Sequence, residues 1–116
     1  MVISERKVND EVVIEKLVGR FDQTARQAYK GSMDLAIQAG YRQIILDVTE
    51  VSFIDSTARG WLVLSQRRFQ DIEGRLSLAA QHGFIRDILE LTEISEWIPI
   101  FSTQEEAISA TTVSVA

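Results

Sequence analysis

The chain has 116 residues, 46% of them hydrophobic, which is a size and composition typical of one domain built around a single core. Its 17 acidic and 12 basic residues leave a formal charge of -5, and this charge disfavours nucleic acid and anionic membrane surfaces as partners. With no cysteine and one histidine, the sequence excludes disulfides, thiolate nucleophiles, Cys-based metal sites and a multi-His metal site within one copy.

The N-terminal segment predicts a β-hairpin. Residues 2–8 and 11–18 are rich in β-branched side chains, and Asn9-Asp10 between them is typical of a turn. We expect these two strands to open a sheet.

An amphipathic helix is predicted after Asp22. This residue is a good N-cap because its carboxylate can accept hydrogen bonds from N–H groups that have no partner in the first helical turn. Small or apolar residues then recur at three- and four-residue spacing as far as Gly40, which supplies a stop. The stripe consists of Ala25, Ala28, Tyr29, Ser32, Leu35, Ala36 and Ala39.

A strand and a second helix are predicted in the middle of the chain. Residues 43–48 are too apolar and too few for a surface helix, which favours a strand covered on at least one face. A second stripe at helical spacing follows and ends at Gly74. Its members are Ala58, Trp61, Leu62, Ser65, Phe69 and Ile72.

The last third of the chain predicts two further strands and two helices. Residues 76–80 and 97–101 are the strands, and Ser102 with Glu105 forms an S-x-x-E capping box for a final helix. The apolar residues of the short helix between the strands are Phe84, Ile85, Ile88 and Leu89. We expect residues 111–116 to form a flexible tail.

The predicted order of elements is β-β-α-β-α-β-α-β-α. Strands separated by helices require right-handed crossovers and largely parallel pairing, so we expect an α/β fold with a mixed sheet whose antiparallel part is the hairpin. No repeat or linker divides the chain, which predicts one domain over residues 1–110. No apolar stretch approaches the roughly 20 residues that cross a bilayer and no signal peptide is evident, so we expect a cytoplasmic protein without a membrane partner.

Few residues suit catalysis. His82 is the only imidazole, and its neighbours offer no Ser or Cys with a carboxylate for nucleophilic catalysis. Glu105-Glu106 fit a helix start, and Arg67-Arg68 point to different sides of a helix and favour a solvated face. No glycine-rich phosphate loop is present, so we expect neither an enzyme nor a bound cofactor or metal.

The stretch FIDSTARGW, residues 53–61, holds the remaining candidate site. Asp55, Ser56 and Thr57 lie where an internal strand ends and a helix begins. One reading is structural, with Asp55 or Ser56 capping the helix. The other is functional, because ligands of open α/β sheets gather at this edge and a phosphate added there would meet free N–H groups at the positive end of the helix.

Two motifs make the sequence resemble the STAS domain, in the form of the bacterial anti-sigma factor antagonists. Residues 19–22, read as Gly-Arg-Phe-Asp, resemble the family's Gly-x-Leu/Phe-Asp at the start of its first helix. Residues 44–48 followed by 51–57 resemble its central signature, and the resemblance extends over nearly the whole chain. It implies a mixed sheet of four or five strands covered by about four helices.

The resemblance also implies a mechanism, which is partner switching. It makes Ser56 the phosphorylated residue and implies partner contacts at Asp22, Asp55, Ser56, Thr57 and Arg59. The implied partners are an anti-sigma factor or related serine-protein kinase of the histidine-kinase-like ATPase fold, which binds the unphosphorylated form, and a PP2C-type phosphatase that resets the switch. Phosphorylation adds about -1.5 to -2 charges at pH 7, enough to disrupt a desolvated contact.

One departure from the family signature concerns the start of the second helix. Where the family continues Asp-Ser-Ser/Thr-Gly-Leu-Gly, this chain has Ala58 and Arg59 before Gly60. Arg59 places a cation in the first helical turn, where the macrodipole disfavours it. An acidic partner surface or a phosphate on Ser56, three residues away, would compensate. The departure thus leaves the switch residue intact and bears on the identity of the partner.

Two other functions of such a module stay open. One is the same switch acting on an output other than a sigma factor, such as biofilm formation or motility. The other is a constitutive scaffold or a transporter-associated STAS subunit in which Ser56 only caps the helix. The discriminating observation is whether a kinase of the histidine-kinase-like ATPase fold is encoded beside the gene.

Overall fold

The computed structural model describes the backbone of residues 1–113 and the side chains of residues 1–111. Within these residues, the strands are β1 Val2–Lys7, β2 Val12–Phe21, β3 Gln43–Ile54, β4 Arg75–Ala79 and β5 Ile100–Phe101. The α-helices are α1 Arg26–Gln38, α2 Ser56–Asp71, α3 Phe84–Leu91 and α4 Gln104–Val113. Two 3-10 turns complete the order, η1 Gln23–Ala25 before α1 and η2 Ile94–Glu96 after α3.

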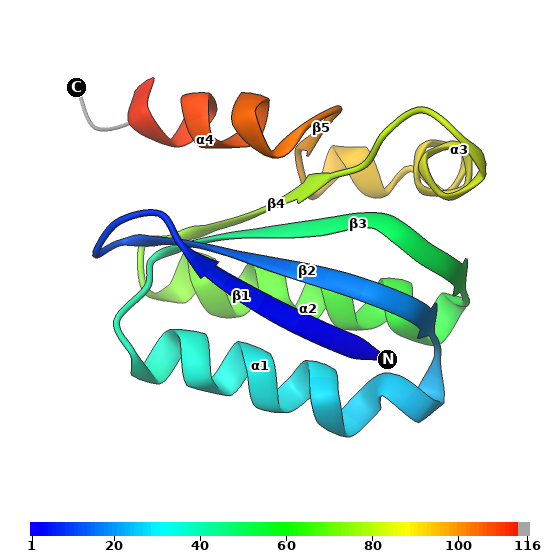
Figure 1. The fold of residues 1–116 in the computed structure, drawn as a ribbon, viewed down its shortest axis with the longest axis horizontal. Coiled ribbons are helices and arrows are strands. Elements are labelled where there is room, and N and C mark those ends of the chain that lie inside the picture. Colours follow the sequence, from blue (N-terminus) through cyan, green and yellow to red (C-terminus); the bar gives the residue numbers. More distant parts are fainter. Residues whose placement is uncertain (114–116) are drawn as a thin grey trace.

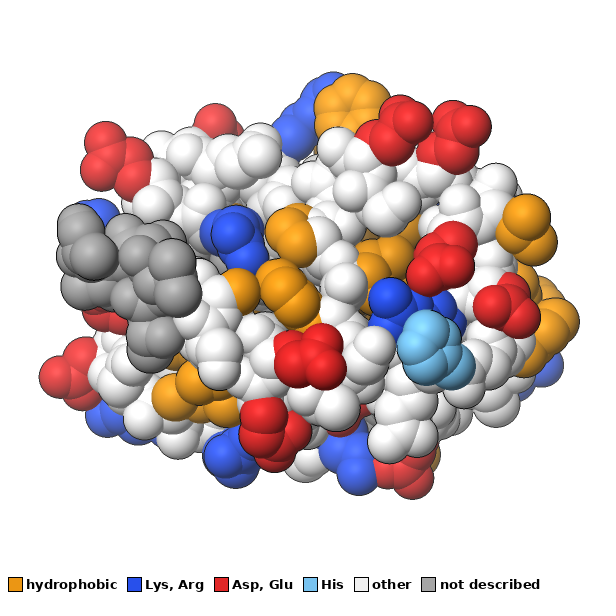
Figure 2. Space-filling view, turned by 90° about the horizontal axis from the view of Figure 1, so that it is seen from above, with side chains coloured by type: hydrophobic (Ala, Val, Ile, Leu, Met, Phe, Trp, Pro, Cys, Tyr) orange, Lys and Arg blue, Asp and Glu red, His pale blue; other side chains and the backbone are white. Residues whose placement is uncertain are grey.

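The sheet confirms the predicted α/β class and the mixed pairing. Its five strands lie in sequence order, β1-β2-β3-β4-β5, with β1 antiparallel to β2 and the other neighbours parallel. Figure 1 shows α1 and α2 side by side on one face and α3 and α4 on the other. Figure 2 views the molecule from the side of α3 and α4, where acidic and basic side chains are interspersed. No helix among the described residues combines the length and the apolar character that crossing a membrane requires.

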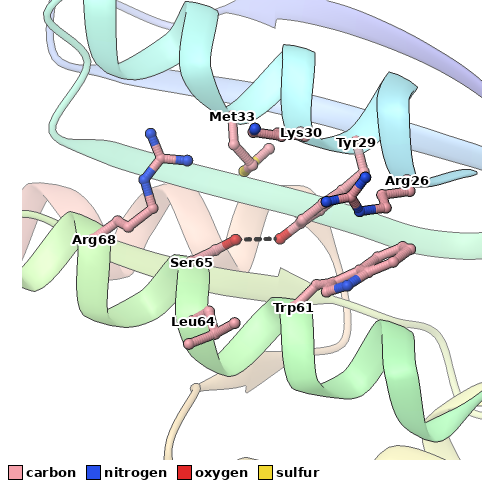
Figure 3. Close-up of a pocket in the computed structure, with 8 residues that line it drawn as sticks. All are labelled: Arg26, Tyr29, Lys30, Met33, Trp61, Leu64, Ser65 and Arg68. Atoms are coloured by element: carbon pink, nitrogen blue, oxygen red, sulfur yellow. Dashed lines mark hydrogen bonds between the residues drawn. The ribbon is translucent and has the colours of Figure 1, made fainter. Parts of the chain in front are cut away.

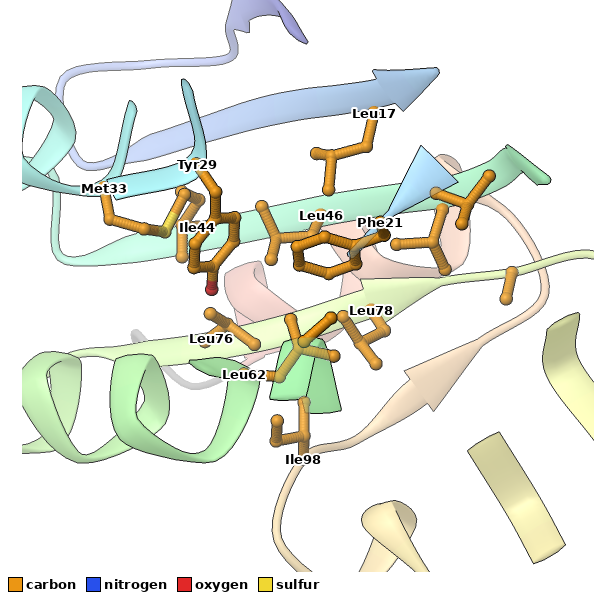
Figure 4. Packing of buried hydrophobic residues seen from close by; sticks show 14 of the residues in the cluster. Leu17, Phe21, Tyr29, Met33, Ile44, Leu46, Leu62, Leu76, Leu78 and Ile98 are labelled. Carbon is orange, nitrogen blue, oxygen red and sulfur yellow. The ribbon is translucent and has the colours of Figure 1, made fainter. Parts of the chain in front are cut away.

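Both faces of the sheet are buried near the start of β2 and in the first half of β3, which explains the short apolar runs there. Alternate residues of β2 and β3 point to opposite faces because the side-chain period of a strand is two. The larger cluster packs under α1 and α2 and includes Leu17, Phe21, Ile44, Leu46, Leu62 and Leu76 (Figure 4). A smaller one contains Val12, Ile14, Ile45, Ala79 and Ala107, the last from α4.

The buried stripe of the first helix differs from the predicted one. Tyr29 and Ala36 are buried as expected, but Leu35 is 66% exposed and Met33 is buried instead. Both sets of positions fit a 3.6-residue period, so the pattern alone could not choose between two adjacent rows. Packing against the sheet selects the row that contains Met33.

Three strands have ends that differ clearly from the prediction. The second strand was expected over 11–18, but β2 continues to Phe21. The third strand was expected over 43–48, but β3 continues to Ile54 because β2 runs to Phe21 and pairs with it along its length, with two register shifts. The last strand was expected over 97–101, but β5 is only Ile100–Phe101. The preceding residues turn through η2 instead, which leaves Trp97 58% exposed.

The N-cap of the last helix lies one residue later in the chain than predicted. Glu106 N–H donates to the Thr103 hydroxyl at 3.1 Å, and Ser102 N–H donates to the Glu106 carboxylate at 3.3 Å. The capping pair is therefore Thr103 with Glu106, not Ser102 with Glu105. The helix also reaches Val113, into the segment predicted as a tail, and the rest of that segment, residues 114–116, lies outside the described residues.

Gly74 ends the second helical segment for a steric reason. A Cβ at this position would lie 1.9 Å from the carbonyl oxygen of Arg42. The close approach lets Arg75 N–H donate to that oxygen at 2.9 Å. A glycine here therefore lets β4 begin alongside β3.

A carboxyl group is buried between the sheet and the first helix. Glu15 of β2 is 3% exposed and faces α1, where Ser32 hydrogen-bonds to it. Burial raises the pKa of Glu15 from 4.5 to about 7, against the opposing effect of the Ser32 hydrogen bond. A group of this kind makes the stability of the fold depend on pH.

We predict that the free energy of unfolding falls as the pH rises from 4.5 to about 7. A carboxyl whose pKa is raised in the folded state stabilises that state fully below the pKa of the unfolded chain and loses the contribution as the pH passes the folded pKa. The full change is on the order of 3 kcal/mol. Glu15→Gln should remove most of this dependence in urea unfolding at pH 5 and pH 8, whereas the exposed-site control Glu96→Gln, at a residue that does not act on Glu15, should keep it. A Glu15→Gln protein with the parent's pH dependence would contradict the assignment.

Candidate functional site

The candidate site lies at the carboxyl edge of two parallel strands. Phe21 at the end of β2 is paired with Ile54 at the end of β3, so Asp22 and Asp55 follow neighbouring strand ends. The backbone N–H of Asp55 donates to the Phe21 carbonyl at 3.4 Å. The pairing of the strands therefore brings together the two aspartates that the sequence motifs singled out separately.

Asp55 is the cap of the second helix. Its backbone is extended, its Oδ1 accepts from Ala58 N–H at 2.8 Å, and its carbonyl accepts from Arg59 N–H at 3.1 Å. Between the two residues proposed as caps, the structure selects Asp55. This bond satisfies one of the N–H groups that a helix start leaves without an intrahelical acceptor.

Ser56 is the first residue of α2 and is exposed, as is Thr57 beside it. No hydrogen bond of the Ser56 hydroxyl is found among the described residues. The backbone N–H groups of these first two helical positions have no acceptor inside the helix. The hydroxyl is therefore open to an approaching enzyme, and an anion attached to it would lie close to free donors.

Asp22 is held by its own neighbours. Its carboxylate accepts from Thr24 N–H at 3.0 Å and from the Thr24 hydroxyl at 2.5 Å, and it pairs with Arg20 Nε at 3.0 Å. The hydrogen bond from the Thr24 hydroxyl, together with Arg20, holds the pKa of Asp22 below its usual value. Asp22 thus caps a helix as predicted, but the helix it caps is the 3-10 turn η1 that leads into α1.

Sequence reasoning missed two residues beside this edge, Arg20 and Phe53. They are paired across β2 and β3, and the Arg20 guanidinium carbon lies 4.3 Å from the centroid of the Phe53 ring. Phe53 is 38% exposed, so the pair presents an apolar ring and a cation to the solvent. No local sequence pattern indicated this contact, because the strand register that pairs the two residues is set by the tertiary structure.

Arg59 is half-buried in the first turn of α2. No ion pair of this guanidinium is found within the described part of the chain. The chain's own described residues therefore supply no carboxylate to offset the unfavourable helix position, and compensation from outside stays a prediction.

The remaining candidates lie away from this edge. His82 is exposed in the loop between β4 and α3, as expected for a solvated histidine. Arg67 is also exposed, but Arg68 pairs with Asp34 of α1 at 2.8 Å. Arg68 is itself exposed, so the expected solvated face is confirmed for both arginines, and the ion pair of Arg68 forms because α1 lies beside α2.

The chain is similar to known proteins in sequence pattern and in fold. A sequence model of the STAS domain matches residues 4–107, and no curated protein sequence matches the chain. Among solved structures, the anti-sigma factor antagonist SpoIIAA in its unphosphorylated form is similar with a TM-score of 0.78 and 24% identity over 96% of each chain.

Two further structures share the fold. SpoIIAA from Bacillus in the phosphorylated form gives a TM-score of 0.71 and 24% identity, covering 95% of this chain and 99% of that one. An anti-sigma factor antagonist from Mycobacterium paratuberculosis gives 0.80 and 18%, covering 94% of this chain and 93% of that one.

We predict that Asp55→Ala lowers the free energy of unfolding by about 1 kcal/mol, the usual cost of losing an N-cap side chain. Asp55→Asn keeps an oxygen acceptor and should cost much less. Ser56→Ala should change stability by no more than about 0.5 kcal/mol, because the exposed hydroxyl takes no part in the cap. Urea unfolding of the three variants tests this, and an equal loss in Ser56→Ala would show that the hydroxyl is structural.

Proposed function

The chain belongs to the STAS domain family, and we propose that it is an anti-sigma factor antagonist that works by partner switching. In this proposal the chain binds an anti-sigma factor, or a related serine-protein kinase of the histidine-kinase-like ATPase fold, while Ser56 carries no phosphate. Phosphorylation of Ser56 by that partner dissociates the complex, and a PP2C-type phosphatase removes the phosphate so that the chain can bind again. The chain catalyses no reaction in this cycle.

The observation that carries the proposal is the exposed Ser56 hydroxyl beside a cap that does not use it. Asp55 accepts the Ala58 N–H without help from Ser56. A kinase can therefore modify the hydroxyl while the helix start stays intact. The shared fold adds support, because SpoIIAA has been solved in a phosphorylated and an unphosphorylated form.

A phosphate on Ser56 would change the charge of this edge. It would add about -1.5 to -2 charges at pH 7, next to Asp55. The free N–H groups of the first helical turn favour an anion there, so the modified chain would remain folded. A partner surface that covers Ser56 would instead meet like-charge repulsion and lost fit, which is the physical basis of release.

Arg59 supplies the specificity in this proposal. A cation in the first turn opposes the helix macrodipole, and no ion pair offsets it in the described part of the chain. An acidic group on the partner would turn this unfavourable position into a favourable contact. Aspartates 22 and 55 and Thr57 would complete the contact area around Ser56.

Two alternatives keep the same site but change its use. A constitutive scaffold or transporter-associated subunit would need Ser56 only for capping, and the cap made by Asp55 alone argues against that use. A switch that controls biofilm formation or motility would use Ser56 in the same way, with another output. A gene for a histidine-kinase-like ATPase beside this gene would favour a switch over a scaffold.

We predict that Ser56 is the phosphorylated residue. Each kinase of the histidine-kinase-like ATPase fold from the same genome would be incubated with the chain and ATP, and the site mapped by mass spectrometry. The expected result is one phosphate on Ser56, also in a Thr57→Ala control, and none in Ser56→Ala. Phosphate on Thr57 while Ser56 is intact would overturn the assignment.

We predict opposite effects of two substitutions at Ser56 on binding to that kinase. Ser56→Asp imitates the modified charge and should lose the partner, whereas Ser56→Ala should bind constitutively. A calorimetric titration measures both, and the control is Ser95→Asp, at a serine that is exposed in η2 and lies outside the proposed contact area. Equal affinities of the Asp and Ala variants would show that charge at this position does not control binding.

We predict that Arg59→Leu separates stability from recognition. Removing the cation should leave the free energy of unfolding unchanged or raise it by about 0.3 to 1 kcal/mol, while binding to the native partner weakens. Arg67→Leu, a substitution of an exposed arginine on the same helix, serves as the matched control. Unchanged partner affinity in a folded Arg59→Leu protein would show that this residue plays no part in recognition.

A further inference from the structure

A groove of about 270 Å³ lies between α1 and α2, the two helices that cover one face of the sheet (Figure 3). It belongs to neither the candidate site nor the cap. Trp61, which lines it, lies further along α2 than Ser56. The groove therefore calls for an explanation separate from the phosphorylation switch.

Part of the groove lining is apolar or aromatic. Tyr29 and Met33 of α1 are buried at its base, and Trp61 of α2 stacks on Tyr29 with centroids 6.0 Å apart and planes inclined by 18°. Leu64 contributes a side chain that is 57% exposed. A flat apolar molecule seated here would cover surface that otherwise faces water.

Three cations line the same groove in a chain whose formal charge is -5. Arg68 is paired with Asp34 at 2.8 Å. For Arg26 and Lys30, no ion pair is found among the described residues. Figure 3 shows Arg26 and Arg68 toward opposite ends of the groove, so a bound molecule would meet positive charge near either end. The local charge favours an anionic ligand.

A polar pair lies at the base of the groove. The hydroxyl oxygens of Tyr29 and Ser65 are 2.6 Å apart, and either can be the donor. One hydrogen is used between them, so the accepting hydroxyl still has its own proton to donate. Burial raises the pKa of Tyr29 above its usual value, and its hydroxyl therefore stays neutral at physiological pH.

We propose that this groove binds a small aromatic anion, a molecule of one or two rings that carries a single carboxylate or comparable group. The rings would lie against Trp61 and Leu64, and the anionic group would face Arg26 and Lys30. The groove volume lies near the lower end of the range for ligand pockets, which fits a molecule of this size. The proposal does not depend on the function of Ser56.

The test uses 2-naphthoate as the probe and the two tryptophan indole N–H signals of the intact chain in NMR spectra. Trp61 should shift in a saturable manner. Trp97 should not shift, although it is 58% exposed and would respond to non-specific adsorption. The neutral analogue 2-naphthol should bind more weakly. A missing Trp61 shift, equal shifts of both indoles, or equal affinities of the charged and neutral probes would each overturn the proposal.

Substitutions of charged residues test whether 2-naphthoate binds in this groove. Arg26→Gln with Lys30→Gln should weaken 2-naphthoate binding about fivefold or more, as expected for the loss of two partly screened charges. Arg67→Gln, an arginine of α2 that does not line the groove, should bind as the parent does. Full affinity in a folded double variant would overturn the proposal. Ser56→Ala should bind 2-naphthoate as the parent does, because Ser56 does not line the groove. A failure of the groove proposal would therefore not count against the proposed switch at Ser56.

Discussion

The parallel pairing of β2 with β3 is the constraint on which the rest of the structure depends. It covers both strands from their first residues to Phe21 and Ile54. It places both strands at the centre of the sheet, and it aligns the carboxyl ends of the two strands. Because the strands end together, Asp22 and Asp55 start their helices side by side, one at η1 and the other at α2. The position of the site is thus a consequence of sheet register.

The start of α2 divides two tasks between adjacent residues. Asp55 supplies the capping oxygen, and Ser56 remains exposed. Because the capping bond comes from Asp55, the Ser56 hydroxyl can take another partner without loss of that bond. With the tasks separated, charge can be added at this edge at little cost to the fold. Asp22 is likewise engaged with Thr24 and Arg20, so its orientation is set within the chain.

The helix α2 joins the two regions of interest. Its first turn carries Ser56 and Arg59, and its later turns supply Trp61 and Ser65 to the groove shared with α1. Charge is unevenly distributed along this helix and its neighbour: the chain is acidic overall, yet cations line the groove. The two regions thus differ in chemistry, one exposing a hydroxyl beside carboxylates and the other an aromatic wall with cations.

The sequence by itself determined the order of elements, the mixed α/β class, Asp22 as a cap and the position of Asp55-Ser56 at a strand-to-helix junction, because these follow from local periodicity and capping chemistry. Only the tertiary structure decided that Met33 rather than Leu35 is buried and that β3 extends to Ile54. It alone paired Arg20 with Phe53, and it brought α1 and α2 together to form the groove. Both rows of α1 fit a helical period, and neither the strand register nor the contact between helices is encoded in a local pattern. These features depend on which surfaces pack together when the chain closes its core.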